Sequence, residues 1–455
     1  MSTEIVASAP PRSMLRGGTR EVLILAYPVV LTQLSQTLMF AVDAAMVGRL
    51  GATELGAAGF GGIWIWTTLC LFMGTVSGVQ TFVSQEHGAG DATRAGRWVW
   101  QSLCGVLPLA LAGITLLVVT LPAWLAILGP TEALQGHCVA YVHGRAFGLP
   151  ADIACMAMAS FYRGIGDTKT PLYITVAANV VNGVLTYALI FGSFGLPQWG
   201  VFGAGVATSV ATWVYLIAIL TCFLRPSLAR RFGTRQLHVD LPTVRRFLRT
   251  SLPIGGQWLL DMSAFALFAT LVARMGDVSM AANQAMLNLL SFSFMLAYGI
   301  SISCSVLVGR YVGAGDPESA ERSLHSSIKL GLALATLVAA LFLTIPGPLF
   351  RIFSHDPGVL ELGGPLLLLA AAFQVIDALG IVVGGALRGA GDTRWPFLVQ
   401  TGLAWGLRVP LVYLVGVSLG KGVLGAWTAE LVYICVLGAA FFWRFRGGAW
   451  KSVRI

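Results

Sequence analysis

Residues 163–171 read RGIGDTKTP and residues 388–396 read RGAGDTRWP, so one pattern occurs twice, 225 positions apart. The other matches at this separation are Pro28 with Pro253, Gly51 with Gly276, and residues 88–91 with residues 313–316, which both read GAGD. One further match, of residues 200–204 with residues 422–426, is 222 positions apart and therefore indicates a three-residue slip. A register kept over so much of the chain is not expected from chance or low complexity, and it predicts two homologous halves.

Both halves have the composition of a membrane protein. Of 455 residues, 56% are hydrophobic and 11% are charged, and the mean hydropathy is +0.79, which leaves too little polar surface for a water-soluble globule of this length. A helix needs about 20 mostly apolar residues to cross a bilayer. Twelve such runs occur, at approximately residues 22–48, 57–83, 98–128, 133–162, 170–194, 201–224, 247–273, 281–309, 323–349, 359–387, 396–419 and 422–443.

These runs predict the fold class and its division into domains. We expect an all-α membrane protein with twelve transmembrane helices in two six-helix lobes. Because six is even, both halves enter the membrane from the same side, so the repeat is parallel, with a pseudo-two-fold axis along the membrane normal. The polar, arginine-rich residues 225–246 form the predicted cytoplasmic linker between an N-terminal lobe, residues 1–224, and a C-terminal lobe, residues 247–455.

The basic residues predict the orientation in the membrane. With a cytoplasmic N-terminus, the termini and the even-numbered loops hold 22 Lys and Arg residues, whereas the opposite loops hold only Arg49, Arg274, Arg351 and Lys421. The positive-inside rule then places both termini in the cytoplasm. The net charge of +9 therefore reflects membrane sidedness, and we expect no nucleic-acid partner. Residues 1–20 lack the apolar stretch of a cleavable signal peptide, so the first helix directs the chain to the inner (plasma) membrane.

No motif of an enzyme or of a metal site is present. The seven cysteines show no CxxC spacing and fall within or beside apolar runs, which predicts buried free thiols. HExxH and GxSxG are absent, and no nucleophile is paired with a base. The GxGDT stretches lack the strand context of a nucleotide-binding loop and predict turns instead. We expect no catalytic activity, no metal and no cofactor apart from a coupling ion.

Acidic residues inside apolar helices are energetically costly and therefore mark candidate functional sites. Asp261 lies twelve residues after Arg249, and Asp377 lies eleven before Arg388. At a helical rise of about 1.5 Å per residue, both acids are about 16 to 18 Å from the cytoplasmic boundary, near the middle of the bilayer. Both belong to the C-terminal lobe, so an ion or proton could be handled between them. Asp43, on the first helix, lies about 9 Å from the outer boundary, where a snorkelling acid is the alternative.

Two further acids have a basic residue nearby. Asp152 is the repeat partner of Asp377, but Arg145 lies seven residues before it on the same face, about two helical turns away. Glu430 is matched by Arg408 on the preceding helix. Structural ion pairs are the favoured interpretation of both, and a coupling role for Asp152 stays open.

Taken together, these elements resemble the multidrug and toxic compound extrusion family over nearly the whole chain. The elements are the first-helix residues Tyr27, Pro28, Gln36, Thr37, Asp43 and Gly48, the doubled RGxGDTxxP pattern, and Ala281-Ala282-Asn283-Gln284 with Asn288. Each is weak alone, and their order in both halves makes the resemblance specific. It implies a V-shaped pair of six-helix lobes that exports lipophilic cations in exchange for inward-moving Na⁺ or H⁺, with a monomer as the working unit.

The resemblance also implies roles for individual residues. Asp43 falls where members carry the first-helix acid of the N-terminal lobe, and Asn182 matches a fifth-helix amide associated with it. One turn later, where members often have Asn or Asp, this chain has Thr186.

In the C-terminal lobe the match is with the branch called NorM-like. Asp377 matches that branch's tenth-helix aspartate, and Gln284 and Asn288 match its eighth-helix amides as candidate cation ligands. Asp261 stands where the branch usually has Glu, which keeps the charge with one methylene less.

Several functional alternatives stay open from the sequence. Na⁺ requires several oxygen ligands, whereas a proton requires one carboxyl whose pKa is raised by burial, and the sequence supplies candidates for both. A flippase for lipid-linked oligosaccharides shares the wider superfamily's two-lobed plan, although acids outnumber bases within the predicted spans here. An exporter of one specific metabolite is a further alternative. The expected partners are small cationic or lipophilic molecules and the lipid bilayer.

Overall fold

The computed structural model describes residues 16–354 and 356–453, and every regular element within those ranges is helical. Arg12 and Arg454, two of the basic residues counted above, lie outside the described residues. The first half contains α1 (Thr19–Gly48), α2 (Ala52–Ser77), α3 (Val79–Gly88), α4 (Arg97–Leu128), α5 (Glu132–Ala146), α6 (Leu149–Ile165), α7 (Lys169–Phe191), α8 (Gly200–Phe223) and α9 (Pro226–Phe232). The second half contains α10 (Leu241–Ala273), α11 (Asp277–Gly313), α12 (Pro317–Thr344), α13 (Pro346–Arg351), α14 (Pro357–Ala390), α15 (Arg394–Leu403), α16 (Val409–Val412) and α17 (Gly422–Arg446).

The described residues include eleven helices that are long and apolar enough to cross a membrane. The predicted span at residues 133–162 is covered by two consecutive helices, α5 and α6, which have 15 and 17 residues and meet at Phe147 and Gly148. The all-helical fold class predicted from the sequence is confirmed.

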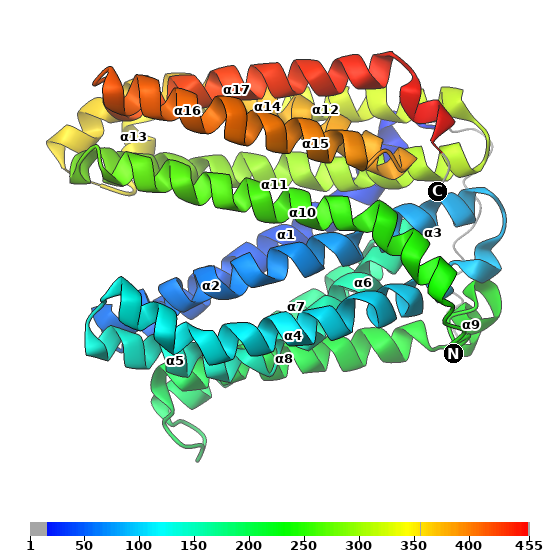
Figure 1. Ribbon diagram of the computed structural model, residues 1–455, viewed down its shortest axis with the longest axis horizontal. Helices are drawn as coiled ribbons and strands as arrows, with labels where there is room; N and C mark the ends of the chain where they lie inside the picture. Colours follow the sequence, from blue (N-terminus) through cyan, green and yellow to red (C-terminus); the bar gives the residue numbers. More distant parts are fainter. Residues whose placement is uncertain (1–15, 355, 454–455) are drawn as a thin grey trace.

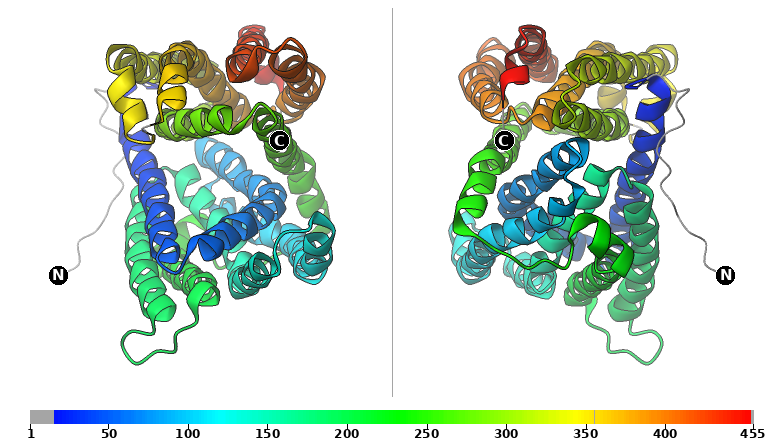
Figure 2. Two further views of the ribbon diagram at one scale, coloured as in Figure 1. Left: turned by 90° about the vertical axis from the view of Figure 1, so that its left-hand side faces the viewer. Right: turned by 90° about the vertical axis from the view of Figure 1, so that its right-hand side faces the viewer.

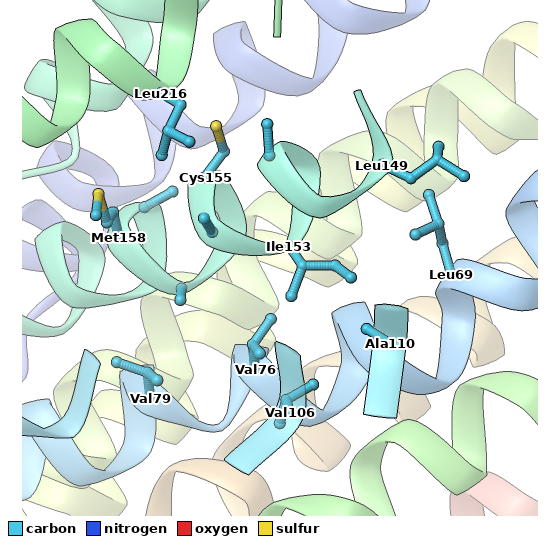
Figure 3. Packing of buried hydrophobic residues seen from close by; sticks show 14 of the residues in the cluster. Leu69, Val76, Val79, Val106, Ala110, Leu149, Ile153, Cys155, Met158 and Leu216 are labelled. Carbon is cyan, nitrogen blue, oxygen red and sulfur yellow. The ribbon is translucent and has the colours of Figure 1, made fainter. Parts of the chain in front are cut away.

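The helices form two bundles that lie one above the other, with α1 to α9 in one and α10 to α17 in the other (Figure 1). The N-terminal lobe has a core built from α2, α3, α4, α6 and α8, part of which, including Leu69, Val106 and Ile153, is drawn in Figure 3. The C-terminal lobe has two main buried clusters. Because apolar side chains on several helices of one lobe meet in a shared cluster, each bundle is stabilised by its own packing.

Helix α1 joins the two lobes. Near its start, Val22 and Leu25 pack in a cluster of the C-terminal lobe, whereas further along Val47 packs with α7 and α8 of its own lobe. Figure 2 shows α1, in dark blue, passing along the side of the molecule from one bundle to the other. Pro28 lies within this helix at the transition.

The lobes meet at the end of the molecule that carries both described chain ends. Gly17 packs against the start of α12, and Lys451 forms a 2.5 Å ion pair with Glu321 in the same helix, so both chain ends lie at this end. A Cβ on Gly74 in α2 would lie 2.7 Å from the Cα of Gly255 in α10, so the backbones of the two lobes are in close contact. Away from this end the two bundles diverge (Figure 1).

The two RGxGDT stretches form turns, as predicted. Gly166 and Gly391 end α6 and α14 with φ of 88° and 90°, in the left-handed region that glycine adopts readily. Asp167 then accepts hydrogen bonds from the backbone N–H and the hydroxyl of Thr170, at 3.0 and 2.6 Å. Asp392 instead forms a 2.9 Å ion pair with Arg444.

The linker between the lobes is partly helical and packs on the N-terminal lobe. Phe232 of α9 belongs to the N-terminal core, and the carbonyl of Thr234 accepts a hydrogen bond from the indole of Trp100. Helix α10 begins at Leu241, inside the range expected to be linker, because Asp240 caps it through the backbone N–H and hydroxyl of Thr243. These hydrogen bonds stabilise the ionised carboxylate and lower the pKa of Asp240.

The three-residue slip between the halves lies in one span and the loop that follows it. Helix α7 has 23 residues, whereas the equivalent span, residues 394–418, has 25 and contains two π-helical turns, at residues 404–408 and 413–418. The loop after α7 covers residues 192–199, but the loop after the second span covers only residues 419–421. A π-turn accommodates one residue more than an α-turn, so the longer span and the shorter loop account for the slip.

The seven cysteines are all free thiols, as expected, but only four of them are buried, and Cys222 is half-buried. Cys104 and Cys435 are exposed, because each lies on the outward face of its helix.

Candidate functional site

The C-terminal lobe contains an arginine that contacts two acids. The Nε of Arg408 lies 2.7 Å from Glu430 Oε2, and both side chains are buried. Its Nη1 lies 3.8 Å from Oδ1 of Asp261, whose side chain is 42% exposed. Arg408 therefore joins a buried acid to an accessible one. Sequence reasoning identified the pair with Glu430 and missed the contact with Asp261.

Aromatic rings hold the guanidinium of Arg408 in place. Its Cζ lies 5.4 Å from the ring centroid of Tyr433 and 5.7 Å from those of Phe265 and Phe268. Cation–π attraction of this kind is worth more when the cation is desolvated, as here. The aromatic residues of α10 and α17 thus position the charge that the acids share.

Asp377 joins this cluster from α14. It is partly buried and has no hydrogen bond or ion pair with any described residue, and its charge interacts with those of Glu430, Asp261 and Arg408. The structure thus brings Asp261 and Asp377 into one region of the C-terminal lobe. Two carboxyl groups contact the guanidinium and a third, that of Asp377, interacts with them through its charge, so the cluster holds more acids than bases.

The two predicted amide ligands lie on α11 and form no hydrogen bond with the acids of this cluster among the described residues. Gln284 and Asn288 are exposed on α11, one turn apart, and neither side chain is hydrogen-bonded within the described ranges. Met295 and Gly299 occupy the same helix face further along, and they contact Gln33 and Val30 of α1. This face of α11 is therefore turned towards the N-terminal lobe.

In the N-terminal lobe, Asp43 and Asn182 form the pair that the resemblance implies. The Nδ2 of Asn182 donates to both carboxylate oxygens of Asp43, at 2.9 and 3.1 Å. Thr186 is fully buried one turn further along α7, beside the same carboxylate. The Oδ1 of Asn182 is buried without a hydrogen-bond partner in the described structure, which leaves one acceptor free at this site.

Asp152 forms the structural ion pair that was favoured for it. Its Oδ2 lies 2.6 Å from Arg145 Nη2, and its Oδ1 accepts a 3.4 Å hydrogen bond from Thr212. The charge of Arg145 also acts on Asp43. Among the candidate acids, Asp152 in one lobe and Glu430 in the other are therefore each closely paired with an arginine, whereas Asp43, Asp261 and Asp377 are not.

Described residues contain no group of three or more His, Cys, Asp or Glu side chains arranged to hold a metal ion.

Hydrogen bonds across the lobe interface hold this conformation together. Glu21 of α1 accepts a 2.8 Å hydrogen bond from the Tyr311 hydroxyl of α11, and the Arg310 guanidinium lies 3.9 Å away. From α3, Thr81 and Gln85 donate to the backbone carbonyls of Arg388 and Gly389, both at 3.0 Å. These contacts lie at the chain-end side of the molecule, beyond the acid clusters.

Two stretches of this sequence, residues 28–188 and residues 253–414, each match the model of one family, MatE. The chain belongs to the MatE family. The two matched stretches begin 225 positions apart, which is the separation of the internal repeat.

Curated relatives of this MatE chain cover almost its whole length. It is 32% identical to a probable multidrug resistance protein NorM of Rhodopseudomonas palustris, over 96% of this chain and 94% of the relative. It is 30% identical to a protein of the same description from Mannheimia succiniciproducens, over 93% of both chains. A solved structure described as the outward-facing conformation of a multidrug resistance MATE family transporter is 19% identical, with a TM-score of 0.85 over 96% of this chain and 97% of that one.

Proposed function

We propose that this protein is a secondary active multidrug efflux antiporter that exports lipophilic cations in exchange for Na⁺ or H⁺ across the inner membrane. Family membership and the relatives described as multidrug resistance proteins support an efflux role. The observation that carries the coupling proposal is the excess of carboxyl groups over guanidinium in the C-terminal lobe, with Asp261 partly exposed.

Asp261 and Asp377 are the proposed coupling residues. Glu430 holds Arg408 at 2.7 Å, whereas Asp261 is 3.8 Å away, so Asp261 keeps much of its capacity to attract another cation. Inside a low-dielectric lobe such attraction is stronger than in water. A lipophilic cation therefore binds when the carboxylates are ionised and free, and it is released when Na⁺ or a proton neutralises them.

Asp43 and Asn182 are proposed as a second coupling site in the N-terminal lobe. The Asp43 carboxylate and the free Oδ1 of Asn182 provide the oxygen atoms that a cation would need. Asp152 is not part of this proposal, because Arg145 already neutralises it at 2.6 Å.

The closed lobe interface supports an outward-facing state. The lobes contact each other at the end that carries both chain ends, and the positive-inside rule predicts that end to be cytoplasmic. Export then requires the interface of α1, α2 and α3 with α10 and α11 to open while the opposite end closes. An ion gradient drives this cycle because ion and cargo have different affinities for the two states.

Efflux by carboxamide variants tests the coupling proposal. Asp261→Asn and Asp377→Asn each remove a charge while keeping side-chain size, so each is expected to abolish dye export driven by an imposed Na⁺ or pH gradient in membrane vesicles. Glu361→Gln is the matched control, since Glu361 is an exposed acid on the same helix as Asp377. Full gradient-driven efflux by both Asn variants, at equal expression, would contradict the proposal, and the gradient that drives wild-type efflux identifies the ion.

A further inference from the structure

The two arginines of the repeated RGxGDT pattern line one small cavity between the lobes. Arg163 lies in the last turn of α6 in the N-terminal lobe, and Arg388 lies in the last turn of α14 in the C-terminal lobe. The cavity has a volume of about 40 Å³, and its polar lining includes Gln80, Ser301 and Tyr298. Two arginines at equivalent positions of the internal repeat, one from each lobe, therefore line the same cavity.

Neither arginine is neutralised by an acid. Over residues 16–354 and 356–453, no carboxylate forms an ion pair with Arg163 or Arg388. Arg163 donates to the Ser160 hydroxyl at 2.9 Å and approaches the Met156 sulfur at 3.4 Å, while its Nε is buried without a partner. Arg388 has one long hydrogen bond, of 3.4 Å, to the Ser301 hydroxyl.

The backbone around the cavity is fixed by contacts between the lobes. The carbonyl of Arg388 accepts a hydrogen bond from Thr81, and the amide of Gln80 donates to the carbonyl of Ile302 at 3.3 Å. Both guanidinium groups therefore border the same cavity in this conformation. A partly desolvated cation without a counter-charge destabilises the structure, so two unpaired guanidinium groups beside one cavity favour an anion in it.

We propose that this cavity binds one small monovalent inorganic anion, such as chloride, between Arg163 and Arg388. The guanidinium groups supply the charge, and the hydroxyl of Tyr298 supplies a further donor. A single water needs about 10–15 Å³ of comparable volume. The cavity is therefore large enough for a small inorganic anion.

Anion binding would also favour one conformation of the protein. Because Arg163 and Arg388 belong to different lobes, separation of the lobes at this end divides the site. An anion that binds only the closed interface shifts the equilibrium towards the state described here. This role is separate from the proposed coupling at Asp261 and Asp377, and it does not depend on which compound is exported.

Bromide tests for the site directly. Crystals of the full-length wild-type protein grown in sodium bromide are expected to show an anomalous peak inside the cavity. Density for water alone at saturating bromide would overturn the proposal.

Thermal unfolding in detergent gives a second readout. Replacing gluconate by chloride at constant Na⁺ is expected to raise the melting temperature of the wild type with a saturable dependence. Arg163→Gln and Arg388→Gln are each expected to raise the half-saturating chloride concentration by about tenfold or more, because each removes charged donors to the anion. Arg94→Gln, at an exposed arginine paired with Asp91, should keep the wild-type dependence. A wild type that melts equally in both salts would contradict the inference, as would an unchanged chloride dependence in both glutamine variants.

Discussion

At Arg408, one guanidinium is shared by two acids at unequal distances, 2.7 Å to Glu430 and 3.8 Å to Asp261. The shorter contact is buried, so its main effect is to neutralise a charge that the lobe interior would otherwise not tolerate. The longer contact leaves the Asp261 carboxylate able to attract another cation. One residue therefore serves the stability of the lobe through Glu430 and adjusts the charge of the candidate site through Asp261.

Replacing Arg408 alone should destabilise the protein more than replacing both Arg408 and Glu430. Arg408→Met leaves Glu430 buried without a counter-charge, which is expected to destabilise the protein by about 3–5 kcal/mol. The double variant Arg408→Met/Glu430→Leu should recover most of that loss, because neither charge remains. Thermal melting of the purified variants measures this, and a double variant no more stable than the single one would contradict it.

Some of the residue-level contacts could be predicted from the sequence, and others could not. The pair of Arg145 and Asp152 followed from helical spacing, since seven residues are about two turns. The contact of Arg408 with Asp261 could not be predicted, because it depends on how two helices distant in the sequence are rotated about their own axes. Gln284 and Asn288 entered the ligand set through the family resemblance, and their role stays a prediction, with both side chains unbonded on an exposed face of α11.

At the scale of the elements, the sequence predicted the spans well and their interruptions poorly. Hydropathy locates α5 and α6 as one run, because both helices are apolar and only two residues separate them. The π-helical turns at residues 404–408 and 413–418 leave no trace in composition, since they change backbone hydrogen bonding without changing polarity. The slip in register did not reveal them either, because the second copy is shorter overall, owing to its short loop at residues 419–421.

The contact of α2 with α10 depends on glycine at the crossing point. Gly74→Ala would place a methyl group 2.7 Å from the Cα of Gly255, so this substitution should push the lobes apart and shift the protein away from the closed interface. We expect slower efflux and a longer distance between spin labels placed on α3 and α11.

Gly62→Ala is the control for that experiment. Gly62 lies on the same helix, and a Cβ there meets no atom within 4 Å. Its variant should behave as wild type, whereas an unchanged inter-label distance in Gly74→Ala would show that the crossing does not limit closure.

For the whole molecule, the predicted orientation can be checked by labelling. Lys421 precedes α17 and Lys451 follows it, and both are exposed at opposite ends of the molecule. A membrane-impermeant maleimide should label Lys421→Cys in intact cells and Lys451→Cys only after permeabilisation. Wild-type cells, which contain the exposed Cys104 and Cys435, set the background. Labelling of Lys451→Cys in intact cells would reverse the assigned sidedness and the assignment of an outward-facing state.

The overall architecture could be predicted from the sequence because the repeat and the hydropathy are both long-range patterns. The conformational state was not accessible, because it depends on contacts such as that between Glu21 and Tyr311, 290 positions apart. One sequence encodes both the inward-facing and the outward-facing state of a carrier, so the sequence alone does not distinguish them.

The wide turns between Ala404 and Ser418 have an evolutionary consequence. If the gene arose by duplication of one ancestral half, each wide turn marks a residue that one copy has and the other lacks. Such a difference turns everything beyond it by about 100° around the helix axis, so a position that met lipid in one copy meets the protein interior in the other. Arg408 lies at the end of the first wide turn, and the residue 225 positions before it is Gly183, so the two copies differ in side chain as well as in backbone at this point.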